Sequence, residues 1–326
     1  MVCRIFKYAY FNVDALLSLA YALHGRAAWC DMATAPRAGS LNWTIFVYFE
    51  DGVKWIFRAP RLKIKHFVPD CMSIRSMVAS EAATLKYLKK HTTIPVPEVY
   101  SYKATWNNQI GIPYILMSRA PGYPLSDYDW SNDVSETGDG PSWSRFNEGK
   151  GKLMTQLGGF VSQLLNIRLD KIGSLFENPD GTFRVGECLS PSLVWQSRNT
   201  LETINRGPFS SDTEYFESLI SAFTLHAKGL PLAQEAFFAP IPKQDEYPTH
   251  DSYKSALERW SHFVAIGQKI DSSKNRFSYC IAGQLLGGMI PSLSVEAQGG
   301  FPLLHPDLHW GNIFVDDDLN ITCLID

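Results

Sequence analysis

Residues 303–315 read L-L-H-P-D-L-H-W-G-N-I-F-V and carry three chemically useful side chains, His305, Asp307 and Asn312. An apolar run follows Asn312, then an acidic turn, a second apolar run and finally Asp326. This order predicts a β-hairpin, with Asn312 before its first strand and Asp326 at the end of its second. The hairpin would bring two oxygen ligands to one edge, as a hard cation such as Mg²⁺ requires.

The spacing H-x-D-x-x-x-x-N is that of a kinase catalytic loop. In such a loop Asp307 would accept or orient the proton of an attacking hydroxyl group, and Asn312 would bind magnesium through its amide oxygen. His305 would support the loop. A surface loop with a buried structural histidine is the alternative, although the hairpin and Asp326 argue against a chance match.

The N-terminal half begins with a predicted β-hairpin. Residues 43–49 and 53–58 are rich in aromatic and β-branched residues and are separated by E-D-G. Asp-Gly between two such runs favours a tight turn, because glycine permits positive φ angles. Residues 76–90 then repeat apolar residues at helical spacing, and residues 114–117 read as a further strand. Together these elements make a small, mostly β, first lobe.

The rest of the chain is predicted to be mainly helical. Residues 127–148 are polar, contain Gly and Pro, and read as a loop. Apolar residues at helical spacing then define further helical regions at 153–165, 214–226, 253–270 and 277–286. The sequence therefore predicts an α+β fold with a small β-rich lobe at 1–119 and a larger, mainly helical lobe at 120–326.

The motif H-P-D-L-H-W-G-N-I-F-V, followed by C-L-I-D, resembles the signature of the aminoglycoside phosphotransferase and choline kinase family. Shorter matches are I-P-V-P-E-V-Y at 94–100, Y-I-L-M at 114–117 and I-G-S-L at 172–175. The resemblance covers nearly the whole chain. It implies a bilobal protein-kinase-like fold, with ATP bound between a nucleotide-binding lobe and a catalytic lobe. It also implies transfer of the ATP γ-phosphate to a hydroxyl group of a small molecule, whose identity the sequence does not give.

A pair between Arg58 and Glu81 is expected in the first lobe. Glu81 lies at helical spacing from Met77, Val78 and Leu85, on the face predicted to be buried. A buried carboxylate needs a cation beside it. In the family that the chain resembles, the position of Arg58 holds a phosphate-binding lysine, so the pair would hold the ATP phosphates. A guanidinium can bind phosphate bidentately, but its geometry differs from that of an ammonium. The alternative is a structural salt bridge.

Two further segments are candidates for binding ATP. Residues 38–42, A-G-S-L-N, precede the first strand, and backbone N–H groups around Ser40 could face phosphate. This loop has a single glycine. Met117, Ser118 and Ala120 would form the hinge between the lobes and offer backbone hydrogen bonds to adenine. The alternative is that this segment is simply a strand end.

Composition excludes some classes of protein. The net charge is −3 and no dense basic tract occurs, so nucleic acid is not an expected partner. The six cysteines form no C-x-x-C pair, which favours neither a zinc site nor a disulfide framework and suits the cytoplasm. The apolar stretch 15–23 loosely imitates a secretory signal, but Asp14 interrupts it and it is too short to span a bilayer. An amphipathic helix is expected at this stretch. The protein is not expected to have a membrane as a partner.

Two other functions compete with a phosphotransferase. The alternation of His305, Asp307 and His309 could mark a metal-dependent hydrolase, although no second cluster of metal-ligating residues follows in the sequence. The chain also stops at Asp326, whereas members of the family that it resembles continue with further helices. A truncated chain is therefore expected, and a nucleotide-binding pseudoenzyme is the main alternative. The oligomeric state cannot be predicted.

Overall fold

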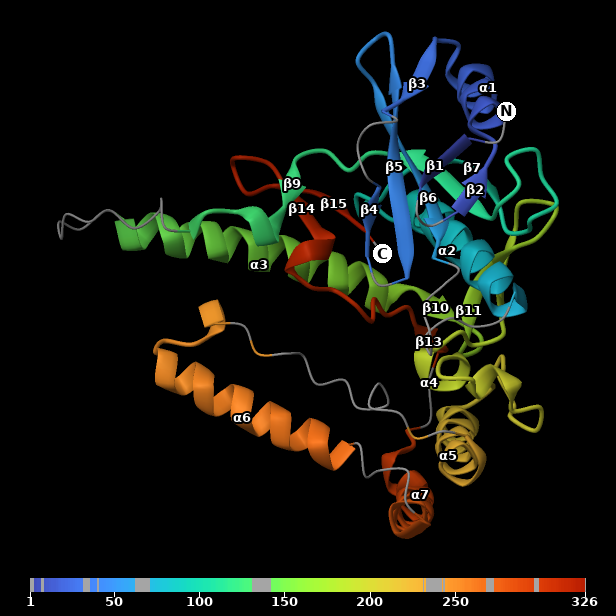
Figure 1. The fold of residues 1–326 in the computed structure, drawn as a ribbon, viewed down its shortest axis with the longest axis vertical. Helices are drawn as coiled ribbons and strands as arrows, with labels where there is room; N and C mark the ends of the chain where they lie inside the picture. The colour runs from blue at the N-terminus through green and yellow to red at the C-terminus, as the bar shows by residue number, and fades with distance from the viewer. Residues whose placement is uncertain are drawn as a thin grey trace. The chain divides into compact units, whose positions relative to one another are not determined.

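The computed structural model describes residues 3–6, 9–31, 36–39, 41–61, 71–130, 142–230, 232, 242, 244–267, 273–295 and 299–325. The chain forms two compact units (Figure 1). The first unit comprises Met1–Lys63, Ile74–Gly186 and Gln298–Asp326, and the second comprises Ile64–Ser73 and Glu187–Ala297. Every site residue predicted from the sequence belongs to the first unit. The division into lobes at residues 119 and 120 stays a prediction.

A six-stranded antiparallel sheet forms much of the first unit, with strand order β3-β5-β6-β8-β7 and β4 paired to β5. Its strands are β3 (Ala28–Cys30), β4 (Arg37–Ala38), β5 (Asn42–Phe49), β6 (Lys54–Pro60), β7 (Val99–Lys103) and β8 (Tyr114–Ser118). Buried and partly exposed residues alternate along β5, as expected for a strand that turns one face to a core. The predicted hairpin is β5–β6, and Gly52 in its turn has a φ of +84°.

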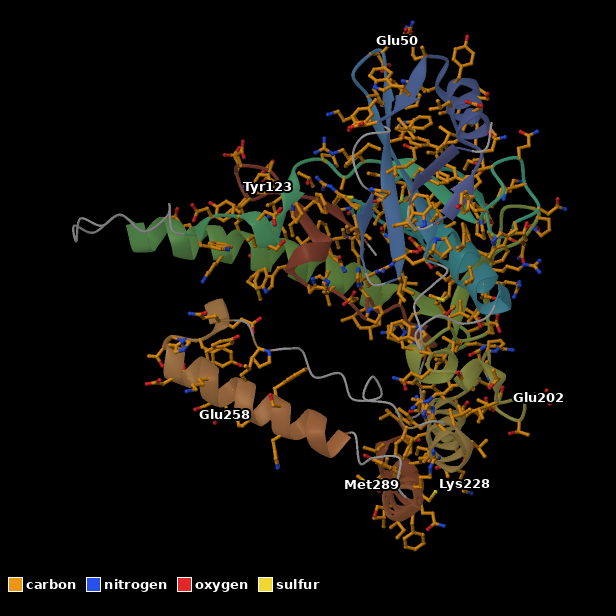
Figure 2. All side chains as sticks on the ribbon, in the orientation of Figure 1. Glu50, Tyr123, Glu202, Lys228, Glu258 and Met289 are labelled. Atoms are coloured by element: carbon orange, nitrogen blue, oxygen red, sulfur yellow. The ribbon has the colours of Figure 1, made fainter. Side chains whose placement is uncertain are left out.

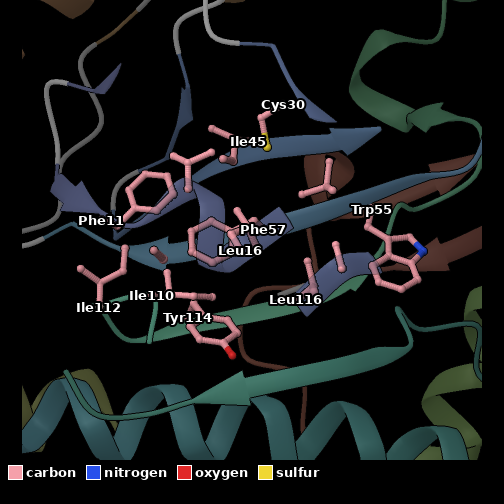
Figure 3. Packing of buried hydrophobic residues seen from close by; sticks show 14 of the residues in the cluster. Phe11, Leu16, Cys30, Ile45, Trp55, Phe57, Ile110, Ile112, Tyr114 and Leu116 are labelled. Carbon is pink, nitrogen blue, oxygen red and sulfur yellow. The ribbon is translucent and has the colours of Figure 1, made fainter. Parts of the chain in front are cut away.

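One face of this sheet carries the main core of the first unit (Figure 3). Phe57 and Leu116 are fully buried there, together with Leu16 from helix α1 (Val13–His24). Asn12 caps α1 by accepting a hydrogen bond from the Ala15 N–H at 3.1 Å. The apolar stretch near the N-terminus is therefore an amphipathic helix that packs on the sheet, as predicted.

Helix α2 (Cys71–His91) begins before the predicted start and ends where expected. Basic residues occupy its last turn, which suits the negative end of the helix dipole. An extended segment with Pro95 and Pro97 follows and leads into β7. The Leu324 N–H donates to the Pro95 carbonyl oxygen at 2.7 Å, so this segment lies against the C-terminal hairpin.

The first unit contains a further set of short strands and helices, including the two strands of that hairpin. They are β1 (Cys3–Phe6), β2 (Ala9–Phe11), β9 (Tyr123–Pro124), η1 (Leu125–Asp127), α3 (Ser142–Asn166), β10 (Arg168–Leu169), β11 (Ser174–Glu177), β12 (Phe183–Gly186), β13 (Phe301–Pro302), η6 (Trp310–Asn312), β14 (Ile313–Val315) and β15 (Ile321–Leu324). The predicted hairpin is β14–β15, and β9 extends it to a three-stranded sheet. The loop predicted at 127–148 is wrong at its end, because α3 already begins at Ser142.

The second unit is mainly helical. Its elements are α4 (Pro191–Val194), η3 (Arg198–Thr200), α5 (Asp212–Gly229), η5 (Gln244–Glu246), α6 (His250–Gly267) and α7 (Ser273–Leu293). Helices α5 and α7 pack closely, because Gly283 leaves room for Thr224 where a β-carbon would not fit. Arg276 donates to the carbonyl oxygens of Ala227 and Leu230 at 2.7 and 2.9 Å and so satisfies the end of α5.

The predicted fold class is confirmed: the chain is α+β, with a β-sheet in its N-terminal region and mainly helices in its C-terminal region. Among the described residues, no helix combines the length and the apolar composition that crossing a membrane would need.

Candidate active site

Asn312 closes the loop at residues 305–312. It is only 6% exposed and lies in η6, directly before β14. Its Nδ2 donates to the Asp307 carbonyl oxygen at 3.0 Å and lies 3.4 Å from Asp307 Oδ2. Because the nitrogen is engaged with the loop, Oδ1 is the side-chain atom that could bind a cation. The Asp307 side chain is 69% exposed, so its carboxylate is accessible from solvent.

Two histidines hold the backbone of this loop. His305 Nδ1 accepts from the Asp307 N–H at 3.2 Å, so a neutral ring carries its proton on Nε2, which lies 3.4 Å from the Ile325 carbonyl oxygen. His309 Nδ1 accepts from the Gly311 N–H at 3.0 Å. Both rings therefore contact the loop backbone, while the role of His305 stays a prediction.

The C-terminal hairpin returns the chain to Asn312. The Ile325 N–H donates to the Asn312 carbonyl oxygen at 3.0 Å. Asp326 follows Ile325 in the sequence but lies outside the described residues, so its assignment as a metal ligand stays a prediction. Burial raises the pKa of Cys323 in β15 to about 12, so this thiol stays protonated at neutral pH and contributes packing.

The connector after β8 is packed tightly against the same hairpin. Gly122 has a φ of +77°, and a β-carbon there would clash with the carbonyl group of Val315. Thr322 Oγ1 donates to the Pro121 carbonyl oxygen at 2.7 Å. Tyr123, labelled in Figure 2, pairs with Val315 where β9 joins β14. The connector and the hairpin are therefore one sheet, an arrangement that the sequence pattern did not reveal.

Arg58 and Glu81 lie in contact. Arg58 Nε from β6 is 3.1 Å from Glu81 Oε1 of α2, and their side chains are 14% and 26% exposed. With the Asn42 amide oxygen turned toward the guanidinium, that oxygen accepts from Nη2 at 2.7 Å and from Nε at 3.1 Å. Asn42 thus orients Arg58, and sequence analysis missed it. The assignment of the pair to phosphate binding stays a prediction.

Phe46, Ile56 and Met117 form a row across the sheet. Phe46 is paired with Ile56, and Ile56 with Met117, in the β5–β6–β8 ladders. Directly opposite residues of antiparallel strands point to the same face. Arg58 lies two residues beyond Ile56 in β6, so it shares this face. The row is a line of apolar side chains on the same sheet face as a guanidinium. The two-residue spacing of Ile56 and Arg58 is the signal that could have revealed it.

The predicted hinge begins within β8. Met117 and Ala120 are buried and Ser118 is partly exposed. The Ser118 N–H donates to the Glu98 carbonyl oxygen at 2.8 Å, and Ser118 Oγ accepts from the Glu98 N–H at 2.9 Å. The Ser118 amide is thus engaged with the chain that precedes β7, so it is not a free donor for adenine.

Ser40 lies outside the described residues, but the residues on both sides of it are described. The Gly39 N–H donates to the Asn42 carbonyl oxygen at 2.9 Å. Arg61 Nη1 donates to the Gly39 carbonyl oxygen at 2.6 Å, and its backbone N–H donates to the Leu41 carbonyl oxygen at 2.8 Å. Arg61, which sequence analysis did not single out, therefore braces this segment.

No protein-family model matches the chain. A subtelomeric hrmA-associated cluster protein of Aspergillus fumigatus is 29% identical over 190 residues, which are 55% of this chain and 33% of that protein. Altered inheritance of mitochondria protein 9, mitochondrial, of Candida glabrata is 23% identical over 288 residues, 79% of this chain and 42% of that protein. The chain thus spans less than half the length of these relatives.

Solved structures with similar folds include phosphotransferases and kinases. Macrolide 2'-phosphotransferase MphH of Brachybacterium faecium is 16% identical, with a TM-score of 0.37 over 96% of this chain and 71% of that chain. The Rio2 kinase of Chaetomium thermophilum, solved as an ADP/Mg²⁺-phosphoaspartate complex, is 13% identical, with a TM-score of 0.30 over 84% and 76%. Membership of the aminoglycoside phosphotransferase family is not shown. The proposed function rests on the residues of this chain.

Proposed function

We propose that the chain is a phosphotransferase of a bilobal, protein-kinase-like fold that transfers the γ-phosphoryl group of ATP to a hydroxyl group of a small molecule. The observation that supports this most is the loop in which buried Asn312 holds the backbone of exposed Asp307. A fixed amide oxygen beside an accessible carboxylate is the pair of groups that this reaction needs.

Asp307 orients the acceptor hydroxyl group and receives its proton as the oxygen attacks phosphorus. Its exposure supports this role, since the carboxylate must meet a substrate. Asn312 and Asp326 are the proposed magnesium ligands, and their amide and carboxylate oxygens fit a hard cation. Magnesium, when bound there, would neutralise charge on the transferring phosphate.

Arg58 is the proposed ligand of the ATP phosphates. Glu81 and Asn42 hold its guanidinium, which lowers the entropic cost of binding an anion in one orientation. The apolar row Phe46–Ile56–Met117 on the same sheet face would take the adenine ring. The Ser118 carbonyl and the Ala120 amide would bind its edge, because the Ser118 amide is already engaged. Backbone N–H groups around Ser40 would face the phosphates of ATP.

A nucleotide-binding pseudoenzyme is the second candidate. Arg58 motivates it, because a guanidinium stands where the family that the chain resembles has a lysine. Such a protein would bind ATP through the same face but would transfer no phosphate.

The test is thermal unfolding of the chain with ATP and magnesium, ATP alone and magnesium alone. A ligand that binds only the folded state at 100 times its dissociation constant adds roughly 2.7 kcal/mol. We expect a rise in Tm that needs both ATP and magnesium, followed by phosphate transfer in a screen of small-molecule alcohols. A cooperative transition that none of the ligands shifts would contradict the proposal. A shift without transfer would favour the pseudoenzyme.

Partners and location are part of the proposal. We propose a small molecule as the phosphate acceptor. Nucleic acid and membranes are not proposed as partners. The cytoplasm is the location expected from the sequence, while the Candida relatives are named as mitochondrial proteins, which makes the mitochondrion the alternative. Imaging of the tagged full-length protein would decide between the two.

A further inference from the structure

The hairpin β11–β12 presents two different side chains on one face. Glu177 and Phe183 are directly opposite in its ladder. Opposite residues of antiparallel strands point to the same side, so a carboxylate and an aromatic ring project together. Both contact α2, the helix that carries Glu81.

Glu177 binds α2 through Lys86. Lys86 Nζ lies 2.7 Å from Glu177 Oε2, and the two side chains are 33% and 19% exposed. Tyr102 of β7 donates its hydroxyl group to the same oxygen at 3.2 Å, and the Lys86 ammonium lies 5.0 Å from the centre of its ring. Burial, and then the Glu177 charge, raise the pKa of Tyr102, so its hydroxyl group remains a donor at neutral pH. The contact therefore joins three elements.

Phe183 reaches the last turns of the same helix. Its ring meets Tyr87 edge-on at 5.3 Å and an 89° interplanar angle, and it lies 6.2 Å from the His91 ring. The Lys90 ammonium is 6.0 Å from its centre. An ion pair alone at this exposure contributes little, but an ion pair and aromatic contacts on neighbouring turns restrict both sliding and rotation of a helix.

Glu81 lies five residues before Lys86, about 7.5 Å along α2 at 1.5 Å per residue. We propose that the β11–β12 hairpin is a positioning element for the nucleotide site, which holds α2 through Glu177 and Phe183 so that Glu81 stays on Arg58. The effect on nucleotide rests on the proposed function, because it requires Arg58 to bind phosphate. The effect of the hairpin on the position of α2 does not depend on the proposed function.

The test compares Glu177→Gln with Glu50→Gln in the whole chain. Glu50, at the tip of β5–β6 (Figure 2), is the matched control, since its ion pair with Arg26 is exposed and distant from α2. Hydrogen exchange of peptides from α2 is measured first. We expect faster exchange around Glu81 in Glu177→Gln only, and a Mg-ATP dissociation constant raised about threefold to tenfold. The charge-reversed pair Lys86→Glu with Glu177→Lys should restore both, whereas Glu177→Lys alone should not.

Equal α2 exchange in the two variants would overturn the positioning role, as would faster exchange with unchanged Mg-ATP affinity. Phe183→Leu provides a second route, because it weakens the aromatic contact and leaves every charge in place. If the wild-type chain binds no Mg-ATP, the proposed function fails, and the exchange comparison still decides whether the hairpin holds α2.

Discussion

The side-chain nitrogen of Asn312 donates a hydrogen bond to the backbone carbonyl oxygen of Asp307 at 3.0 Å. This contact ties the residue whose carboxylate would meet the acceptor to the residue whose amide oxygen would meet magnesium. The shorter contact of Asn312 Nδ2 uses the backbone of Asp307, so a change of the Asp307 side chain leaves it in place and alters only the 3.4 Å approach to Oδ2.

Asp307→Asn should separate chemistry from binding. The substitution removes the charge but keeps the shape, so we expect Tm and Mg-ATP affinity close to wild type. Loss of a general base lowers turnover by about 10²–10⁴-fold, which a phosphate-release or transfer assay measures. Asp317→Asn, in the exposed turn of the hairpin, is the control and should keep full turnover. Wild-type turnover in Asp307→Asn would remove this residue from the mechanism.

Glu81→Gln should weaken both the fold and the nucleotide site. It removes the charge that meets a largely buried guanidinium, and hydrogen bonds to charged groups typically contribute about 1.5–3 kcal/mol. We expect a loss near the lower end of that range in denaturant unfolding, because Glu81 is partly exposed and Asn42 still holds Arg58. Mg-ATP affinity should fall in parallel. Unchanged affinity with lowered stability would make the pair a structural salt bridge.

Gly122→Ala should be much more destabilising than Gly52→Ala. Both glycines have positive φ, with values of +77° and +84°, so either alanine carries a backbone cost of about 1–2 kcal/mol. The β-carbon at Gly52 would meet open space, whereas the one at Gly122 would clash with Val315. Overpacking adds typically about 1–3 kcal/mol. Equal losses in urea unfolding of the two variants would show that the connector is not packed on β14.

Asp316 should make stability depend on pH in the acid range. Hydrogen bonds from the Asn320 side chain and backbone lower its pKa in the folded chain, and the Asp318 amide adds to this. The stabilisation is therefore complete above the ordinary value of about 3.9 and is lost as pH falls through the lowered folded pKa. Compared with Asp316→Asn, the wild type should lose more stability between pH 5 and pH 3. Parallel stability curves for the two proteins would refute this.

Elements with strong local patterns could be predicted from the sequence. The β5–β6 hairpin was predicted because aromatic and β-branched runs flank an Asp-Gly turn. The contact of Arg58 with Glu81 was expected because a carboxylate on a buried helix face needs a cation. The β14–β15 hairpin followed from two apolar runs around an acidic turn.

Elements that depend on distant partners could not be predicted. Strand β9 has two residues, and only its pairing with β14 makes it a strand. Helix α3 begins earlier than its apolar pattern, and its middle turns are bonded to the C-terminal hairpin. Lys152 Nζ donates to the Asp318 carbonyl oxygen at 2.7 Å, and Gln156 Oε1 accepts from the Ile321 N–H at 2.9 Å. Such contacts outweigh the low helix propensity of the glycines at 149 and 151.

The pairing of β9 with β14 limits where the chain can bend. The bond from Thr322 to Pro121, with Gly122 pressed onto Val315, joins the connector to the hairpin that follows the loop at residues 305–312. A tilt of the connector would therefore move β14 and the loop before it as well. If the proposed nucleotide face opens, a pivot at Arg119 or Ala120, before Pro121, would leave this pairing intact. In that case stiffening those two positions, rather than any in the loop, would slow the release of the proposed nucleotide.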